Sequence, residues 1–256
     1  KPEREEKEFL QLIRKLGVPV ISSWTTSDLI PSSHELSIGR SGIFGDRGGN
    51  FTVQNSDLIL SIGSRLSVPQ VGYNFPLFAR AAKKIIVDID SAELNKPSLK
   101  PDLPIQADAR EFMVELLAQL KNAQPFEISD WLKRCQGWKL KYPVVLPEYK
   151  ECKDAVNSFY FIGTLSEKLD KNAVIVTDMG TSFTCTMQTF KTKLGQRLST
   201  SSGHASMGFG LPGAIGACIG NNRKDTICIS GDGGLQMNIQ ELQTIVHYNL
   251  PIKLFV

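Results

Sequence analysis

A glycine-rich turn near the end of the chain carries the residues best suited to chemistry. The run Ser230-Gly231-Asp232-Gly233-Gly234 directly follows the apolar, β-branched stretch 226–229. Glycines after a buried strand let backbone N–H groups approach a phosphate without interference from a Cβ atom. An aspartate beside them offers the hard oxygen that Mg²⁺ binds together with phosphate oxygens and water. The turn therefore predicts a diphosphate site with Asp232 as a metal ligand.

A plainer interpretation of the same turn stays open. Gly-Asp-Gly-Gly also forms ordinary strand-to-helix turns, in which the aspartate caps the helix. Asp232 would then be the cap of the helix that follows, on which Ile239, Leu242, Ile245 and Val246 are expected to share one face.

The elements that must position this turn alternate between strands and helices. Apolar runs predict strands at 18–21, 58–62, 85–89, 173–176 and 226–229. Helical spacing predicts helices over 109–120 and 157–169, and a glycine-rich turn with a helix over 203–219. This alternation indicates an α/β fold with two doubly wound parallel-sheet domains, of which the first is Rossmann-like.

The stretch between the two domains has a different character. Residues 123–152 contain prolines, tryptophans and many charges without a strand pattern, which predicts a part-helical linker. The expected domains are therefore residues 1–122 and 153–256. The last run, 251–256, resembles a buried strand with nothing after it, and the first helical pattern, Phe9 to Leu16, has no strand before it. We expect a fragment of a longer protein, although a natural edge strand at the C-terminus would look the same.

Composition excludes several classes of function. The 256 residues are 41% hydrophobic and 21% charged, without the roughly 20 consecutive apolar residues that a membrane span needs. The charged start lacks the apolar core of a secretory signal, so a cytoplasmic protein without a membrane partner is expected. The 29 basic residues are scattered among 26 acidic ones, which argues against a nucleic-acid partner. The five cysteines form no C-x-x-C pair and are expected to be buried free thiols: Cys135, Cys152, Cys185, Cys218 and Cys228.

Several segments of the second half resemble thiamine-diphosphate-dependent enzymes, most closely the acetolactate synthase branch. These are Gly203 to Ala217, the Gly231 turn and Asn238 to Ile245, which match in order and spacing. The run Thr177-Asp178-Met179-Gly180-Thr181-Ser182 resembles the family turn that reaches the diphosphate, although acetolactate synthases carry Gln and His at the last two positions. The resemblance implies a thiamine-diphosphate-binding domain that is truncated at its C-terminus.

The resemblance also implies which residues hold the cofactor and the metal. The cofactor-binding positions are Gly180, Thr181, Ser182, Ser202, Gly203, His204, Met207, Gly231, Asp232, Gly233 and Gly234. Met207 matches the apolar residue on which the family's cofactor folds, which makes it the catalytic candidate, whereas the plainer interpretation is a core side chain. His204 either faces the cofactor or substrate or is a loop residue. Asp232 would bind Mg²⁺, and the family's second side-chain ligand, an asparagine, would lie beyond Val256.

The first half resembles the central domain of the same family. In acetolactate synthases this domain holds FAD, which performs no redox step, and other members bind ADP or nothing. The matching positions are Gly45, Gly63, Arg65, Asp88 and Asp108, which could contact phosphate or ribose. These residues are equally ordinary in a Rossmann-like topology without the tight G-x-G-x-x-G turn, so an empty site is preferred over bound FAD.

The resemblance implies a thiamine-diphosphate- and Mg²⁺-dependent lyase or transferase that decarboxylates a 2-oxo acid and joins it to a second carbonyl. The alternatives are a simple 2-oxo-acid decarboxylase and a non-catalytic nucleotide-binding module. Family enzymes take a catalytic Glu from an N-terminal domain of the partner subunit. The resemblance therefore implies a homodimer or homotetramer of the full-length protein, and the 256-residue chain alone is expected to be inactive.

Overall fold

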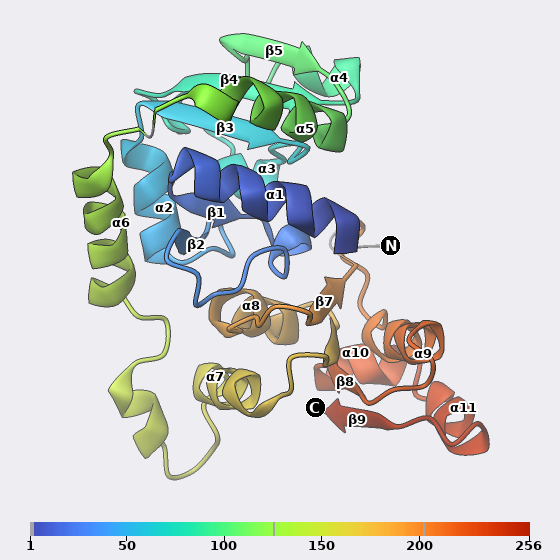
Figure 1. The fold of residues 1–256 in the computed structure, drawn as a ribbon. Coiled ribbons are helices and arrows are strands. Elements are labelled where there is room, and N and C mark those ends of the chain that lie inside the picture. The colour runs from blue at the N-terminus through green and yellow to red at the C-terminus, as the bar shows by residue number, and fades with distance from the viewer. Residues whose placement is uncertain (1–2, 125, 202) are drawn as a thin grey trace. The chain divides into compact units, whose positions relative to one another are not determined.

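The computed structural model describes residues 3–124, 126–201 and 203–256. The chain forms two compact units, the first from Lys1–Ser23 with His34–Pro143 and the second from Trp24–Ser33 with Val144–Val256. All pairings between the described strands are parallel, with helices between them (Figure 1). The predicted α/β class is thereby confirmed. The domain limits at residues 122 and 152 stay a prediction.

Unit 1 consists of α1 Glu3–Leu16, β1 Val20–Ser22, β2 Ser37–Arg40, α2 Arg47–Asn55, β3 Leu58–Ile62, α3 Val68–Val71, η2 Phe75–Leu77, β4 Lys83–Asp88, α4 Ser91–Leu94, β5 Leu103–Gln106, α5 Ala109–Gln119, η3 Leu120–Asn122 and α6 Ser129–Lys141. Strands β3, β4 and β5 form one sheet in that order, and β1 pairs with β2 in a second. Helix α5 packs on β4 and on α1, while α6 packs on α2.

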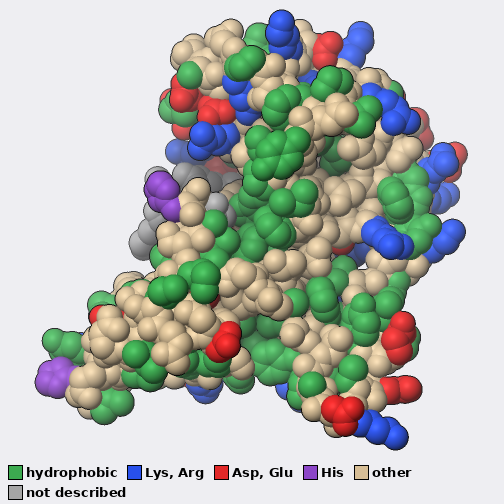
Figure 2. All heavy atoms as spheres, turned by 180° about the vertical axis from the view of Figure 1, so that it is seen from behind, with side chains coloured by type: hydrophobic (Ala, Val, Ile, Leu, Met, Phe, Trp, Pro, Cys, Tyr) green, Lys and Arg blue, Asp and Glu red, His purple; other side chains and the backbone are tan. Residues whose placement is uncertain are grey.

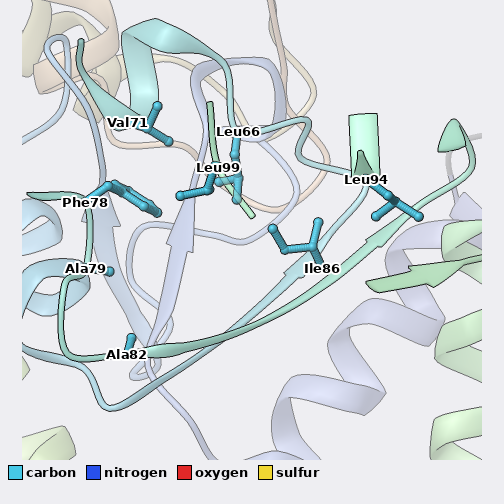
Figure 3. Packing of buried hydrophobic residues seen from close by; sticks show 8 residues of the cluster. All are labelled: Leu66, Val71, Phe78, Ala79, Ala82, Ile86, Leu94 and Leu99. Atoms are coloured by element: carbon cyan, nitrogen blue, oxygen red, sulfur yellow. The ribbon is translucent and has the colours of Figure 1, made fainter. Parts of the chain in front are cut away.

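The sheet of unit 1 is stabilised by a compact apolar core (Figure 3). Its buried members come from β4 and from the segments that follow β3 and β4: Leu66, Val71, Phe78, Ala79, Ala82, Ile86, Leu94 and Leu99. Phe78 is only 4% exposed, and its ring points toward Leu99. The core therefore anchors the chain just beyond the carboxyl end of β3, where Leu66 lies.

Unit 2 consists of η1 Trp24–Thr26, η4 Pro147–Glu151, α7 Ser158–Lys168, β6 Val174–Thr177, α8 Thr181–Thr189, β7 Arg197–Thr200, α9 Gly210–Gly220, β8 Thr226–Ile229, α10 Asp232–Met237, α11 Glu241–His247 and β9 Ile252–Phe255. Its four strands are ordered β7-β6-β8-β9. Helix α9 packs on one face through Ala214, against Val176 and Cys228. Leu254 belongs to that face, whereas the ring of Phe255 lies 5.3 Å from Phe161 of α7. Because adjacent strand residues point to opposite faces, helices cover both sides of this sheet.

Residues 24–33 join unit 2, although they precede most of unit 1 in the sequence. The hydroxyl of Thr192 donates to the carbonyl oxygen of Ser27 at 3.0 Å. The carboxylate of Asp28 accepts from the backbone N–H of Leu198 at 3.1 Å and pairs with Arg197. These bonds fasten the segment beside β7. No sequence pattern predicted this.

Two expectations from the sequence are wrong. The helix expected after the Gly231 turn is interrupted at residues 238–240, and its apolar residues do not share a buried face. Ile245 packs against the core, whereas Val246 is 69% exposed. The cysteines are free, as expected, but Cys152 is exposed because it lies in the loop after η4.

The surface carries charges of both signs. On the face drawn in Figure 2, Lys and Arg side chains are scattered, with Asp and Glu among them. Within the described ranges, no helix combines the length and the apolar character needed to cross a bilayer.

Replacing Phe78 by Ala should lower the free energy of unfolding by about 3–5 kcal/mol, because it leaves a cavity in the core of unit 1. Tyr73→Ala is the control, since Tyr73 is 89% exposed; it should change that energy by less than about 0.5 kcal/mol. Urea unfolding followed by circular dichroism measures both. Equal stabilities of the two variants would contradict the packing described here.

Candidate functional site

The candidate site lies at the carboxyl edge of the sheet in unit 2. Strands β7, β6 and β8 end in register, because Thr177 pairs with Thr200 on one side and with Ile229 on the other. The chain runs from β6 to β7 on one side and then returns to β8 on the other side of β6. The connections thus diverge between β6 and β8. In open α/β sheets, ligands bind in the crevice at such a topological switch point.

This edge collects the predicted cofactor residues of unit 2. Gly180, Thr181 and Ser182 follow β6; Gly203, His204 and Met207 follow β7; and Gly231, Asp232, Gly233 and Gly234 follow β8. Ser202 lies outside the described residues. The structure therefore brings together three segments that are far apart in the sequence, and Met207 touches the Gly231 turn directly. Its Cε atom lies 3.1 Å from where a Cβ on Gly233 would be.

A buried carboxylate that was not among the predicted site residues connects the three segments. Asp178 follows β6 and has no exposed surface. Its carboxylate accepts from the backbone N–H groups of Met179 at 2.7 Å, Gly208 at 3.0 Å and Gly210 at 3.1 Å. It also accepts from the hydroxyl of Ser230 at 3.2 Å. Buried polar groups need such partners, so Asp178 fixes the end of the loop after β7, where α9 begins, and the start of the turn after β8.

Some glycines of this edge are packed against Asp178. A Cβ on Gly210 would lie 2.8 Å from the Cβ of Asp178, and one on Gly234 would lie 2.7 Å from its Oδ2. Both distances are too short for a real side chain. These glycines therefore let the carboxylate approach two helices closely.

Other glycines of the same edge face open space. A Cβ added at Gly180, Gly203 or Gly231 would meet nothing within 4 Å. Gly180 precedes α8 with a φ of 84°, and no side chain caps that helix start. This open room, lined by backbone groups, is what a phosphate-binding cradle requires. The residues present therefore fit a diphosphate.

Asp232 is the first residue of α10, and Gly231 is the N-cap. The interpretation of Asp232 as the helix cap is wrong, since no side chain caps this helix. Its carboxylate is exposed, so it is accessible to a cation. Within the described part of the chain, no three His, Cys, Asp or Glu residues cluster as a metal site. A metal at Asp232 would therefore take its other ligands from phosphate, water or other oxygens.

Met207 and His204 are both exposed on the loop after β7. Met207 is 52% exposed, so the interpretation as a buried core side chain is wrong. His204 could reach a ligand from this loop. That Met207 and His204 contact a cofactor stays a prediction.

Three buried thiols are unreactive because of their surroundings. Cys228 lies in β8 without exposed surface, and burial together with the nearby charge of Asp178 raises its pKa to about 12. Burial also raises the pKa of Cys135 and of Cys185. None of these thiols is suited to act as a nucleophile at neutral pH.

In unit 1, the predicted nucleotide residues follow the strands of the β3-β4-β5 sheet. Gly63 and Arg65 come after β3, Asp88 ends β4, and Asp108 follows β5. Arg65 pairs with Glu93 at 2.8 Å, and Asp108 caps α5 by accepting from the N–H of Arg110 at 2.8 Å. These two side chains thus already have local partners.

Gly45 lies apart from these residues, in the turn between β2 and α2. A Cβ there would lie 2.3 Å from the carbonyl oxygen of Arg40. This contact explains the glycine without a ligand.

The fold and this edge define an α/β protein with a topological switch point in its second unit. Two family models match the chain: thiamine pyrophosphate enzyme, central domain, over residues 2–116, and thiamine pyrophosphate enzyme, C-terminal TPP binding domain, over residues 178–256. The chain belongs to the thiamine pyrophosphate enzyme family.

Curated relatives match along nearly the whole chain. The probable acetolactate synthase large subunit of Methanococcus aeolicus is 33% identical over 98% of this chain and 43% of its own length. The acetolactate synthase isozyme 1 large subunit of Escherichia coli K12 is 34% identical over 96% of this chain and 42% of its own length. Acetolactate synthase 2, chloroplastic, of Nicotiana tabacum is 33% identical over 99% of this chain and 38% of its own length. The chain thus spans about two fifths of the length of these relatives.

Replacing a glycine by alanine should destabilise the protein more at a packed position than at an open one. Gly234→Ala places a Cβ against Asp178 and should lower the free energy of unfolding by about 1–3 kcal/mol. Gly231→Ala faces open space at a φ of −84° and should change it by less than about 1 kcal/mol. Urea unfolding of the full-length protein measures both. A larger loss in Gly231→Ala than in Gly234→Ala would contradict the assigned packing.

Brief alkylation at about pH 8 should modify Cys152 and spare Cys228, because Cys152 is exposed to the reagent, whereas Cys228 is buried and its pKa is raised to about 12. Peptide mass spectrometry locates the modified residues, and alkylation in urea is the control in which both react. Rapid labelling of Cys228 in the native protein would contradict its burial.

Proposed function

We propose that the protein carrying this chain binds thiamine diphosphate with Mg²⁺ at the carboxyl edge of the unit 2 sheet and acts on 2-oxo acids by decarboxylation and carboligation. The observation that carries the proposal is the exposed carboxylate of Asp232 at the switch point, beside the open positions of Gly231 and Gly180. The family membership and the names of the relatives support it.

Each residue has an assigned part in holding the cofactor. Asp232 would bind Mg²⁺, which neutralises the diphosphate. Backbone N–H groups of the Gly231 turn and the hydroxyl of Thr181 would donate to phosphate oxygens, as would Ser182, whose hydroxyl now donates to the carbonyl oxygen of Met179 at 3.1 Å.

Met207 and His204 would act at the other end of the cofactor. When bound, thiamine diphosphate supplies a carbon nucleophile that adds to the carbonyl of a 2-oxo acid and takes up the electron pair released with CO₂. Met207 offers its half-exposed side chain as an apolar surface that orients the cofactor rings. His204, exposed on the same loop, is placed to face the cofactor or the substrate.

We propose that unit 1, as the family's central domain, has a nucleotide-binding site at the carboxyl ends of β3, β4 and β5. Asp88 is buried there, and its carboxylate accepts from the N–H of Asp90 at 3.0 Å. Asp108 already caps α5, which supports an empty site over bound FAD. Flavin absorbance of the purified full-length protein decides between an empty site and bound FAD.

We also propose that the full-length protein is cytoplasmic and forms a homodimer or a homotetramer.

Asp232→Asn should weaken thiamine diphosphate binding in the presence of Mg²⁺ by about 100-fold, because the metal loses a charged ligand. Asp225→Asn is the matched control: Asp225 precedes the same strand, pairs with Lys253 and should leave the affinity unchanged. Calorimetry on the full-length protein measures both affinities. Equal binding by the two variants would refute the metal assignment, and no binding by the unaltered protein would refute the cofactor.

The products formed from pyruvate then separate the candidate activities. A condensed hydroxy acid or ketone supports carboligation, whereas free aldehyde supports a simple decarboxylase. If the protein binds ADP or FAD but does not bind thiamine diphosphate, the result would instead support the non-catalytic nucleotide-binding module.

A further inference from the structure

Gly208, the neighbour of Met207, is held by the chain from both sides. Its backbone N–H donates to both carboxylate oxygens of Asp178, at 3.0 and 3.2 Å. Its carbonyl oxygen accepts from Nδ2 of Asn238 at 2.8 Å. Both polar groups of this peptide position are therefore bound by side chains from other segments.

The fit around Gly208 is tight. Its φ is 90°, which disfavours any residue with a side chain. A Cβ there would lie 2.7 Å from the Cβ of Met237 and 2.8 Å from Nδ2 of Asn238. The end of α10 thus packs directly on this backbone.

Asn238 directly follows α10, but its side-chain amide does not cap that helix. The amide reaches a carbonyl 30 residues earlier in the chain. Capping of α10 by Asn238 would not explain the bond from its amide to Gly208. Its effect is to tie the turn after β8 to the loop after β7.

Met207 depends on this tie because its own side chain is poorly enclosed. It is 52% exposed, and its Cε lies 3.1 Å from the position that a Cβ on Gly233 would take. A side chain with three rotatable bonds and half its surface in water is not fixed by packing. Its position can therefore be held only through the backbone. The hydrogen bonds to Gly208 hold the backbone at the adjacent residue.

We propose that Asn238, with Asp178, is a positioning residue that clamps Gly208 and thereby holds Met207 over the Gly231 turn. Its importance for cofactor binding rests on the function proposed above. The clamp itself does not, because it is a property of the cofactor-free protein.

Methyl NMR of methionine-labelled, cofactor-free full-length protein tests the clamp directly. Asn238→Ala and the isosteric Asn238→Asp both remove the donor to Gly208. Each should shift and narrow the Met207 methyl signal, assigned with Met207→Leu, while the signal of fully buried Met187 stays unchanged. Asn172→Ala, an exposed residue before β6 at the amino edge of the sheet, is the control. An unchanged Met207 signal in both Asn238 variants would overturn the proposal.

A binding cycle tests the consequence for the cofactor. Asn238→Ala should weaken thiamine diphosphate about tenfold, the loss expected for one hydrogen bond, but leave inorganic diphosphate with Mg²⁺ unchanged. In a Met207→Ala background the same substitution should have less than about a twofold effect, because the residue that it positions is gone. Equal losses in both backgrounds would overturn the proposal. If the unaltered protein binds no thiamine diphosphate, the proposed function fails, while the NMR result still decides the clamp.

Discussion

The carboxylate of Asp178 lies without exposed surface where three segments of unit 2 meet, and its hydrogen bonds determine how close those segments come. A buried carboxylate without partners would be strongly destabilising, so the loops must present N–H or O–H groups to it. The end of the loop after β7 and the start of the turn after β8 are therefore held at fixed positions. The exposed residues at this edge, Met207 and Asp232, lie within two residues of groups that are held in this way.

The glycines of this edge consequently have two opposite roles. Gly210 and Gly234 lack a side chain because Asp178 occupies that space, whereas Gly180 and Gly231 leave space that nothing in the chain fills. The first pair serves packing and the second leaves room for a ligand. Since both kinds alternate within a few residues, the sequence alone does not distinguish them. The distinction depends on which atoms approach from another part of the chain.

The same division between local and distant contacts explains what could be predicted. Strand and helix periodicity is local, so the strands at 58–62 and 226–229 were predicted at their observed bounds. The placement of residues 24–33 in unit 2 depends on partners about 160 positions away, such as Thr192. The break after α10 also coincides with a distant contact, since the side chain of Asn238 there bonds to Gly208. Asp178 lies in a run that was matched by resemblance, but its role in organising the motif residues was not predicted.

The two sheets differ in what a ligand would have to displace. At the unit 2 edge the open glycine positions hold no side chain, so a diphosphate could enter there without displacing one; to donate to it, Ser182 would exchange its bond to Met179. At the unit 1 edge Arg65 already pairs with Glu93, but the Arg65 side chain is 73% exposed. An exposed pair of this kind contributes only about 0–1 kcal/mol, so it is a weak barrier to a nucleotide phosphate. Occupancy of unit 1 must therefore depend on how many additional contacts a nucleotide gains there, and not on the ion pair that it would replace.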